Sequence, residues 1–399
     1  MFKWALIVMI IFQFSVLSGC WNAKEITELS IISAVGVDKT DKGEFLVSFQ
    51  LINASEVATG QEGGSRNAST TVVVSSTGDT LFEAIRKATQ SVPRKLYFPH
   101  TNLIVISEEI AQKVGIEKII DWFERDHEIR TNIQVVIARG TRAEDVLMVQ
   151  SAVERISAKK ITNELETSEK AWGENLVTEV DDIIQALVSN GKEITITGIK
   201  LAGNKIEARK VENLQQSKPP TILEVSGIGM FREGKLVQWI DNEAARGLLW
   251  ILNRIKSTIV NLDYQDQRNC ISIEVLRSQT KVSSVIKNGK PTFYVSINTE
   301  GNIAEVDCPV ELEKHETIKE LEIALEEIIE NEAMKVVTIS QNEKSDIFGF
   351  GNVLQRQYPR YWKKNEENWP NLFSTSDVNI VVNAFIRRTG MRTNPFNVE

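Results

Sequence analysis

The feature that most constrains this chain is a leader of mostly apolar residues that ends at a cysteine. One lysine near the start supplies positive charge, Trp4–Val16 form an apolar run, and the motif Leu17–Cys20 (Leu-Ser-Gly-Cys) follows. This order is typical of a secretory signal, in which small residues precede the cleavage site. The pattern predicts that residues 1–19 are a lipoprotein signal peptide cut between Gly19 and Cys20, and that the folded body begins after it.

Cys20 is then the predicted lipidation site, and lipid is the only non-protein group that we expect on this chain. Its sulfur would carry a diacylglyceryl group with palmitate-type acyl chains, with or without a further acyl group on its amino nitrogen. Each buried CH₂ contributes roughly 0.8 kcal/mol, so two chains hold a protein at a bilayer far more firmly than one. We therefore expect a membrane-anchored protein.

Two other interpretations of the leader are less favoured. An ordinary signal peptide has small residues at both −3 and −1 of its cleavage site, and bulky Leu17 would stand at −3. An uncleaved spanning helix needs about 20 apolar residues, and this run is shorter.

Composition narrows the class of the remaining chain. With 399 residues, 42% hydrophobic and 25% charged, it is a folded protein with two or three domains. The net charge of −8 argues against nucleic acid as a partner, because phosphate backbones attract basic surfaces. The same charge argues against a second, polybasic attachment to anionic lipid. Attachment to the membrane would then depend on the acyl anchor alone.

The distribution of apolar residues predicts an α+β protein with several domains, whose mixed sheets are each covered by helices. Residues 20–150 alternate strand-like and helical segments, which indicates an N-terminal α/β domain with some parallel pairing. Residues 151–214 are helix-rich and polar, with a small hairpin expected at 194–210. With part of the preceding region they can form a second domain.

The segment 215–220 (Gln-Gln-Ser-Lys-Pro-Pro) is the best linker in the chain, because it is polar and ends in two prolines. We place the main domain boundary there, followed by a C-terminal α+β domain over residues 221–399. That domain should contain a long Glu-rich helix at about 313–341, with the glutamates on its solvated faces.

A search for catalytic chemistry finds no constellation. The three histidines have no second His or Cys at ligand spacing, so no metal site is predicted; they are His100, His127 and His315. We interpret His100 as structural. No phosphate-binding loop and no nucleophile elbow occur in the sequence. We therefore predict that the protein is not an enzyme.

Two residue pairs leave alternatives open. Cys270 and Cys308 would tolerate a disulfide in an exported protein, but nothing local fixes their distance, so two unpaired thiols are favoured. Trp362 and Trp369 bracket a charged segment and are candidates for a contact surface, since partly exposed aromatic residues often mark one. The competing interpretation, that they fill the core between helix and sheet, is favoured.

The chain resembles the Ger(x)C spore germination lipoproteins, the C subunits of nutrient germinant receptors, in motifs that keep the same order along almost the whole chain after the leader. In the N-terminal half these are Cys20–Ile26, Gly36–Asp38, Phe98–His100 with Leu103–Glu109, and Arg125–Asp126 with Glu128–Arg130. In the C-terminal half they are Gly227–Phe231, Trp239, Arg246–Leu249, Asp346–Gly351, Pro359, Trp362, Trp369 and Phe373. Asn22 and Val37 depart from the residues usual in the family, which are Asp and Ile.

The resemblance implies three α+β domains and a place on the outer face of the inner spore membrane, beside an A subunit and a B subunit. It implies no catalytic residues. The leading hypothesis is a receptor subunit that works through protein–protein contacts in nutrient-triggered germination. An alternative is a lipoprotein that captures a small nutrient directly in a pocket between its domains. An envelope enzyme is the least favoured hypothesis.

Overall fold

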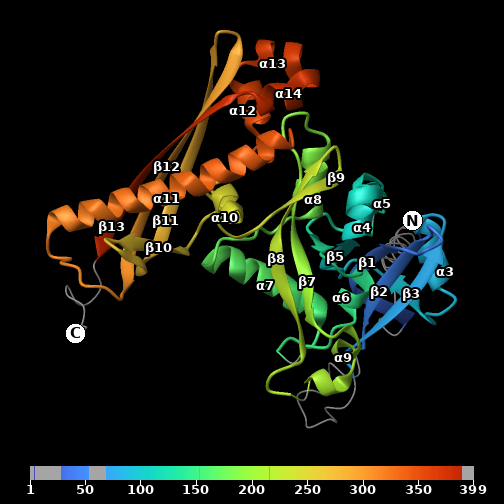
Figure 1. Ribbon diagram of the computed structural model, residues 1–399. Coiled ribbons are helices and arrows are strands. Elements are labelled where there is room, and N and C mark those ends of the chain that lie inside the picture. The colour runs from blue at the N-terminus through green and yellow to red at the C-terminus, as the bar shows by residue number, and fades with distance from the viewer. Residues whose placement is uncertain are drawn as a thin grey trace.

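The computed structural model describes residues 28–53, 69–126, 128–151, 153–214 and 216–388, together with Trp4. These residues form two β-sheets with helices packed on them, one of nine strands and one of four (Figure 1). No helix among them is both long enough and apolar enough to cross a bilayer.

The larger sheet has the strand order β3-β2-β1-β5-β6-β7-β8-β9, and β4 pairs with β1 beside this path. Its strands are β1 (Leu29–Lys39), β2 (Phe45–Ile52), β3 (Thr71–Gly78), β4 (Lys95–Tyr97), β5 (Leu103–Ser107), β6 (Gln134–Ala138), β7 (Thr195–Gly203), β8 (Thr221–Arg232) and β9 (Lys235–Ile240). The central strands β1, β5, β6 and β7 are parallel, whereas β2, β3, β8 and β9 pair antiparallel at the two sides. The expected alternation of strands and helices with parallel pairing is therefore present.

Helices cover both faces of this sheet. One core contains residues of α3 (Leu81–Ala88), α4 (Glu108–Lys113), α5 (Glu117–Arg125) and α8 (Val180–Leu187). The other contains residues of α6 (Ala143–Leu147), α7 (Ser157–Ala171) and α9 (Lys205–Ala208). In β5, Ile104 and Ile106 enter the first core and Leu103 and Val105 the second, because side chains alternate across a strand. That double burial explains why β5 is apolar throughout.

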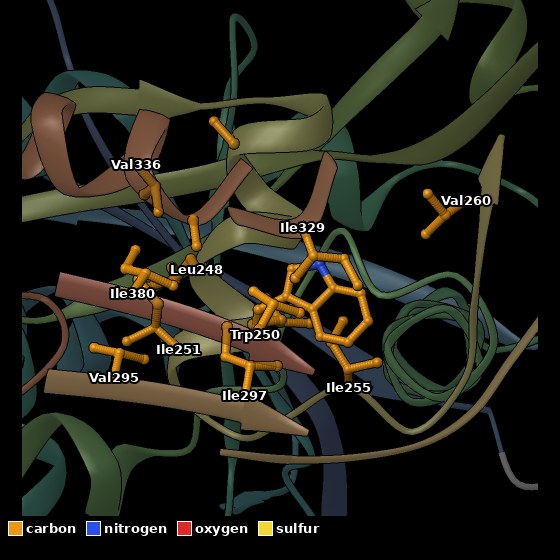
Figure 2. Close-up of a cluster of buried hydrophobic side chains, with 14 of the residues drawn as sticks. Leu248, Trp250, Ile251, Ile255, Val260, Val295, Ile297, Ile329, Val336 and Ile380 are labelled. Atoms are coloured by element: carbon orange, nitrogen blue, oxygen red, sulfur yellow. The ribbon is translucent and has the colours of Figure 1, made fainter. Parts of the chain in front are cut away.

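The smaller sheet has the order β10-β11-β12-β13, with β13 parallel to β12. Its strands are β10 (Thr258–Tyr264), β11 (Gln267–Lys287), β12 (Lys290–Val306) and β13 (Asp377–Arg388), and its helices are α10 (Asn242–Ile251), α11 (His315–Asn342), α12 (Phe350–Gln357), α13 (Pro359–Asn365) and α14 (Trp369–Ser374). Helix α11 runs along the sheet, and α12–α14 sit beside the tip of the long β11–β12 hairpin (Figure 1). Figure 2 shows Trp250 and Leu248 of α10 packed with Ile329 and Val336 of α11 in this core.

The middle of the chain belongs to the larger sheet, on both sides of the predicted linker. The segment 215–220 does not separate the two sheets, because eight of the nine residues of β7 before it pair with β8 after it. The change from one sheet to the other comes later, at α10. The expected hairpin within 194–210 is also absent, since β7 is followed by α9 and a 3₁₀ turn at Val211–Leu214, and β8 is its true partner.

The cysteine expectation is wrong as well. Cys270 on β11 and Cys308 after β12 form a disulfide, with their Cα atoms 5.6 Å apart. The antiparallel pairing of Ile271 with Val306 brings the two cysteines together, which no local pattern in the sequence could reveal. The long helix is confirmed at His315–Asn342, but one of its glutamates is not solvated, as described below.

Candidate functional site

The predicted signal-cleavage and lipidation residues come before the first continuous stretch of the chain that the structure describes. Gly19 and Cys20 lie outside the described residues, as does His127. Of the other histidines, His100 is exposed and its ring lies 5.6 Å from that of Tyr97, and His315 begins α11. In the part of the chain that the structure describes, no three His, Cys, Asp or Glu side chains are grouped as a metal site would require.

Trp362 and Trp369 are core residues, as the favoured interpretation expected, and the alternative that they form a contact surface is wrong. Their exposed fractions are 3% and 2%, and their rings meet edge to face at 5.4 Å. Trp369 also contacts Phe293 of β12 and Phe373 of α14. Between the two tryptophans, α13 and a short 3₁₀ turn expose the charged side chains while both rings turn inward.

A buried carboxylate organises the loop between α11 and α12. Asp346 is 2% exposed and accepts hydrogen bonds from the backbone N–H groups of Gly349, Phe350 and Gly351 at 2.7–3.1 Å. A fourth donor is the indole Nε1 of Trp369, at 3.0 Å. Burial raises the pKa of Asp346 to about 6, and these hydrogen bonds oppose the rise. The family motif Asp346–Gly351 is therefore a structural turn.

This turn also joins the two sheets. The carbonyl oxygen of Asp346 accepts the N–H of Glu193, which precedes β7, at 2.8 Å. Next to it, the hydroxyl of Ser345 donates to the carbonyl oxygen of Phe231 on β8 at 2.6 Å. Both contacts are made by main-chain or buried groups, so the C-terminal helices are held firmly against the larger sheet.

An ion pair lies inside the C-terminal core. Arg246 of α10 and Glu332 of α11 make two hydrogen bonds, of which Nε to Oε2 is 3.0 Å long, and both side chains are almost completely buried. Glu332 also accepts the indole N–H of Trp250 at 3.0 Å. Burial alone would lower the pKa of Arg246, but its bonds to Glu332 raise it. The prediction that the glutamates of this helix face solvent is wrong for Glu332.

The spacing of α11 contained the signal that was missed. Its buried positions include Leu321, Leu325, Ile329 and Val336, which recur every three or four residues. Glu332 falls in that series, so helical periodicity places it on the packed face. A buried carboxylate needs a partner, and Arg246 was already part of the family motif.

A polar cluster lies where the larger sheet meets α4 and α10. Arg139 makes a bidentate ion pair with Asp241 and stacks on the ring of Trp239 at 4.4 Å. The Trp239 indole in turn donates to Glu108 at 2.8 Å. Gly227 has φ +69°, and a Cβ there would lie 2.2 Å from a carboxylate oxygen of Asp241, so glycine is required. The cluster explains why the motif residues Gly227 and Trp239 occur together.

An open groove lies between the end of α7, the α10–α11 pair and the edge strand β10. We call it the β10 groove; its volume is about 700 Å³. It is lined by Trp172, Glu174, Asn242, Glu243, Arg246, Ile259, Asn261, Asp263, Asn269, Ile328, Asn331, Glu332 and Lys335. A second groove of about 360 Å³ lies beside the Asp346 turn. Burial raises the pKa of Glu193 there, and the neighbouring carboxylates Glu233 and Asp346 add to that rise.

Two family models of spore germination proteins match this chain. The family model for the spore germination protein N-terminal domain matches residues 22–201, and the model for the spore germination B3/GerAC-like C-terminal domain matches residues 226–390. The chain is 32% identical to spore germination protein KC of Bacillus subtilis (strain 168) over 396 residues, covering 98% of this chain and 97% of that protein. It is 25% identical to spore germination protein B3 of the same organism over 371 residues, with 92% of each covered.

The crystal structure of the GerBC protein has a similar fold. The TM-score is 0.52 at 20% sequence identity, and the match covers 88% of this chain and 96% of that one. At this identity the likeness supports the fold alone. The KC match covers nearly the full length of both proteins, and the chain therefore belongs to the GerAC-like family of spore germination proteins, the germinant-receptor C subunits.

Proposed function

We propose that this protein is a lipid-anchored C subunit of a nutrient germinant receptor, held through Cys20 on the outer face of the inner spore membrane. It contributes to nutrient-triggered germination through contacts with the receptor A and B subunits and not through catalysis. Anchoring on one membrane raises the effective concentration of its partners.

The observation that carries this proposal is the motif Leu17–Cys20 immediately before the segment in which the family match begins, at residue 22. Among the described residues, no helix is long and apolar enough to cross a membrane. The polar cluster around Arg139 and the β10 groove provide surface for partners.

Replacing Cys20 by alanine in spores tests the anchor. We expect the Cys20→Ala protein to leave the membrane fraction and germination with single nutrients to slow strongly, because tethering is lost. Ser18→Ala is the matched control, since alanine keeps a small residue before the cleavage site and should leave both unchanged. Normal germination of Cys20→Ala spores with every nutrient would contradict the proposal.

Direct capture of a small nutrient is the second candidate, and the β10 groove is the observation that favours it, since it lies between elements of the two halves. Calorimetric titration of the protein with single nutrients tests it. Saturable binding heat that is lost when groove residues are substituted would support this function. No binding heat with any nutrient would exclude it.

A further inference from the structure

We propose that the β10 groove binds an extended, basic segment of a partner protein, which adds a strand to the free edge of β10. This inference deepens the proposed function, and rests on it, by assigning a contact site and the chemistry of the segment that it takes. Three features of the groove lead to it: an open strand edge, an excess of negative charge and an exposed tryptophan.

The first feature is the contrast between the two edges of the smaller sheet. At β13 the edge is closed, because the backbone N–H groups of Ala384 and Ile386 donate to Glu326 and Glu322 of α11, each at 2.9 Å. At β10, the backbone of the outer edge makes a single hydrogen bond among the described residues, in which Arg246 donates to the carbonyl oxygen of Ile259 at 2.8 Å. An uncovered edge strand is a template for another strand.

The direction of that bond shows which backbone groups are available. The Ile259 carbonyl points into the groove and away from β11, since it reaches Arg246. In an antiparallel pair, alternate residues direct their N–H and C=O groups to the same side. Asn261, two residues on and also lining the groove, therefore presents its backbone groups to an incoming segment.

The second feature is charge. Four of the charged residues that line the groove are acidic and two are basic. Glu332 is neutralised by Arg246, and Glu243 by Lys335 at 3.0 Å. Glu174 and Asp263 make no salt bridge in the described structure; Glu174 is half-buried, and its charge acts on Arg246, which is already paired with Glu332. The carboxylates that line the groove therefore outnumber its cations, which favours a segment that carries lysine or arginine beside the free strand edge.

The third feature is Trp172, which follows α7 at the rim of the groove and is 48% exposed. Its carbonyl oxygen accepts the hydroxyl of Thr258 on β10 at 2.7 Å, so its backbone is held while its ring faces solvent. Tryptophans in such positions are frequent anchors at interfaces, and they attract cations over their rings.

The shape of the groove favours a segment over a small amine. A small ligand usually has most of its surface buried by its site. Here Trp172, Asn242, Glu243 and Asn269 are all exposed, so the groove is open along its length. A strand that crosses it can use the edge of β10 and the carboxylates together.

The test uses the full chain after residue 19 and a fluorescent peptide of about ten residues that alternates lysine and valine. We expect saturable binding that weakens about tenfold in the double variant Glu174→Gln/Asp263→Asn and in Trp172→Ala. Asparagine at 263 keeps the acceptor that Asn269 uses at 2.8 Å. Hydrogen–deuterium exchange of the β10 backbone should slow when the peptide binds, because a paired edge protects its amides.

Matched controls separate this site from general attraction to an acidic protein. Glu320→Gln removes an exposed carboxylate of α11 outside the groove, and Phe385→Ala removes an aromatic ring of similar exposure, 44%, from β13. Both should bind the peptide as the parent does, and a peptide that alternates glutamate and valine should not bind.

Several results would overturn the inference: no binding, equal loss in the control variants, or unchanged exchange in β10. Competition by methylamine at equal strength would assign the groove to a small cation instead. These outcomes do not depend on lipid, so they are distinguishable from the result of Cys20→Ala, which tests the anchor.

Discussion

Arg246 and Glu332 approach each other from α10 and α11 as a bidentate ion pair that is almost completely buried at the floor of the β10 groove. The pair sits where the two helices are in closest contact, since a Cβ on Gly247 would lie 2.1 Å from the carbonyl oxygen of Glu332. The small residue lets the helices meet, and the ion pair satisfies the polar groups that this contact buries.

Glu332→Gln should lower the free energy of unfolding by about 3–5 kcal/mol, because it leaves the buried Arg246 without its counter-charge. Urea denaturation measures the loss. Glu330→Gln, at an exposed position of the same helix, should stay within about 0.5 kcal/mol of the parent. The double variant Arg246→Met/Glu332→Leu should recover most of the stability; if Glu332→Gln alone were harmless, the pair would not be stabilising.

Asp346 should make stability depend on pH. Its pKa is about 6 in the folded protein, against an ordinary value of 3.8, so the folded state holds the proton more tightly. Its contribution to the free energy of unfolding is therefore fully present below pH ~4 and declines by about 3 kcal/mol as the pH rises through 6.

To isolate this effect, the free energy of unfolding is measured from pH 4 to pH 7 for the unsubstituted protein (the parent) and for Asp346→Asn. The parent should be the more stable of the two at pH 4, and this advantage in free energy should shrink as the pH rises. Asp266→Asn, at an exposed position, should show a difference that does not change with pH. An advantage that grows with pH would mean that the four hydrogen-bond donors outweigh burial.

The two buried tryptophans differ in one hydrogen bond, which a matched pair of substitutions can measure. Trp369→Phe removes the indole donor to Asp346, whereas Trp362→Phe makes the same change at a buried ring whose indole has no hydrogen-bond partner among the described residues. We expect Trp369→Phe to cost about 1.5–3 kcal/mol more in free energy of unfolding. It should also raise the pKa of Asp346 further; equal losses would show that the indole bond adds nothing.

The disulfide should stabilise the C-terminal sheet. Cys270 and Cys308 are separated by 38 positions, and closing a loop of that length contributes about 2–4 kcal/mol in the chain-entropy account. Reductant should lower the urea midpoint of the parent by a corresponding amount. The variant Cys270→Ser/Cys308→Ser should be less stable and insensitive to reductant. Alkylation of both cysteines in the unfolded, unreduced protein would contradict the pairing.

Much of the architecture was predictable from local pattern. The apolar run of β5 and the length of α11 follow from residue periodicity, which each segment expresses by itself. Family membership also follows from short motifs in a constant order. Failures came where two distant segments meet: β8 joins β7 across the predicted linker 215–220, and Glu332 is buried because Arg246 faces it.

The sequence by itself determined the leader motif at Cys20, the kinds of elements and the family, because these depend on neighbouring residues. Tertiary structure alone decided that Trp362 and Trp369 are buried, that Cys270 meets Cys308, and that the edge of β10 stays open. The physical reason is that burial and pairing are properties of two surfaces in contact. The two surfaces come from residues far apart in the chain, so no short stretch of sequence contains both surfaces.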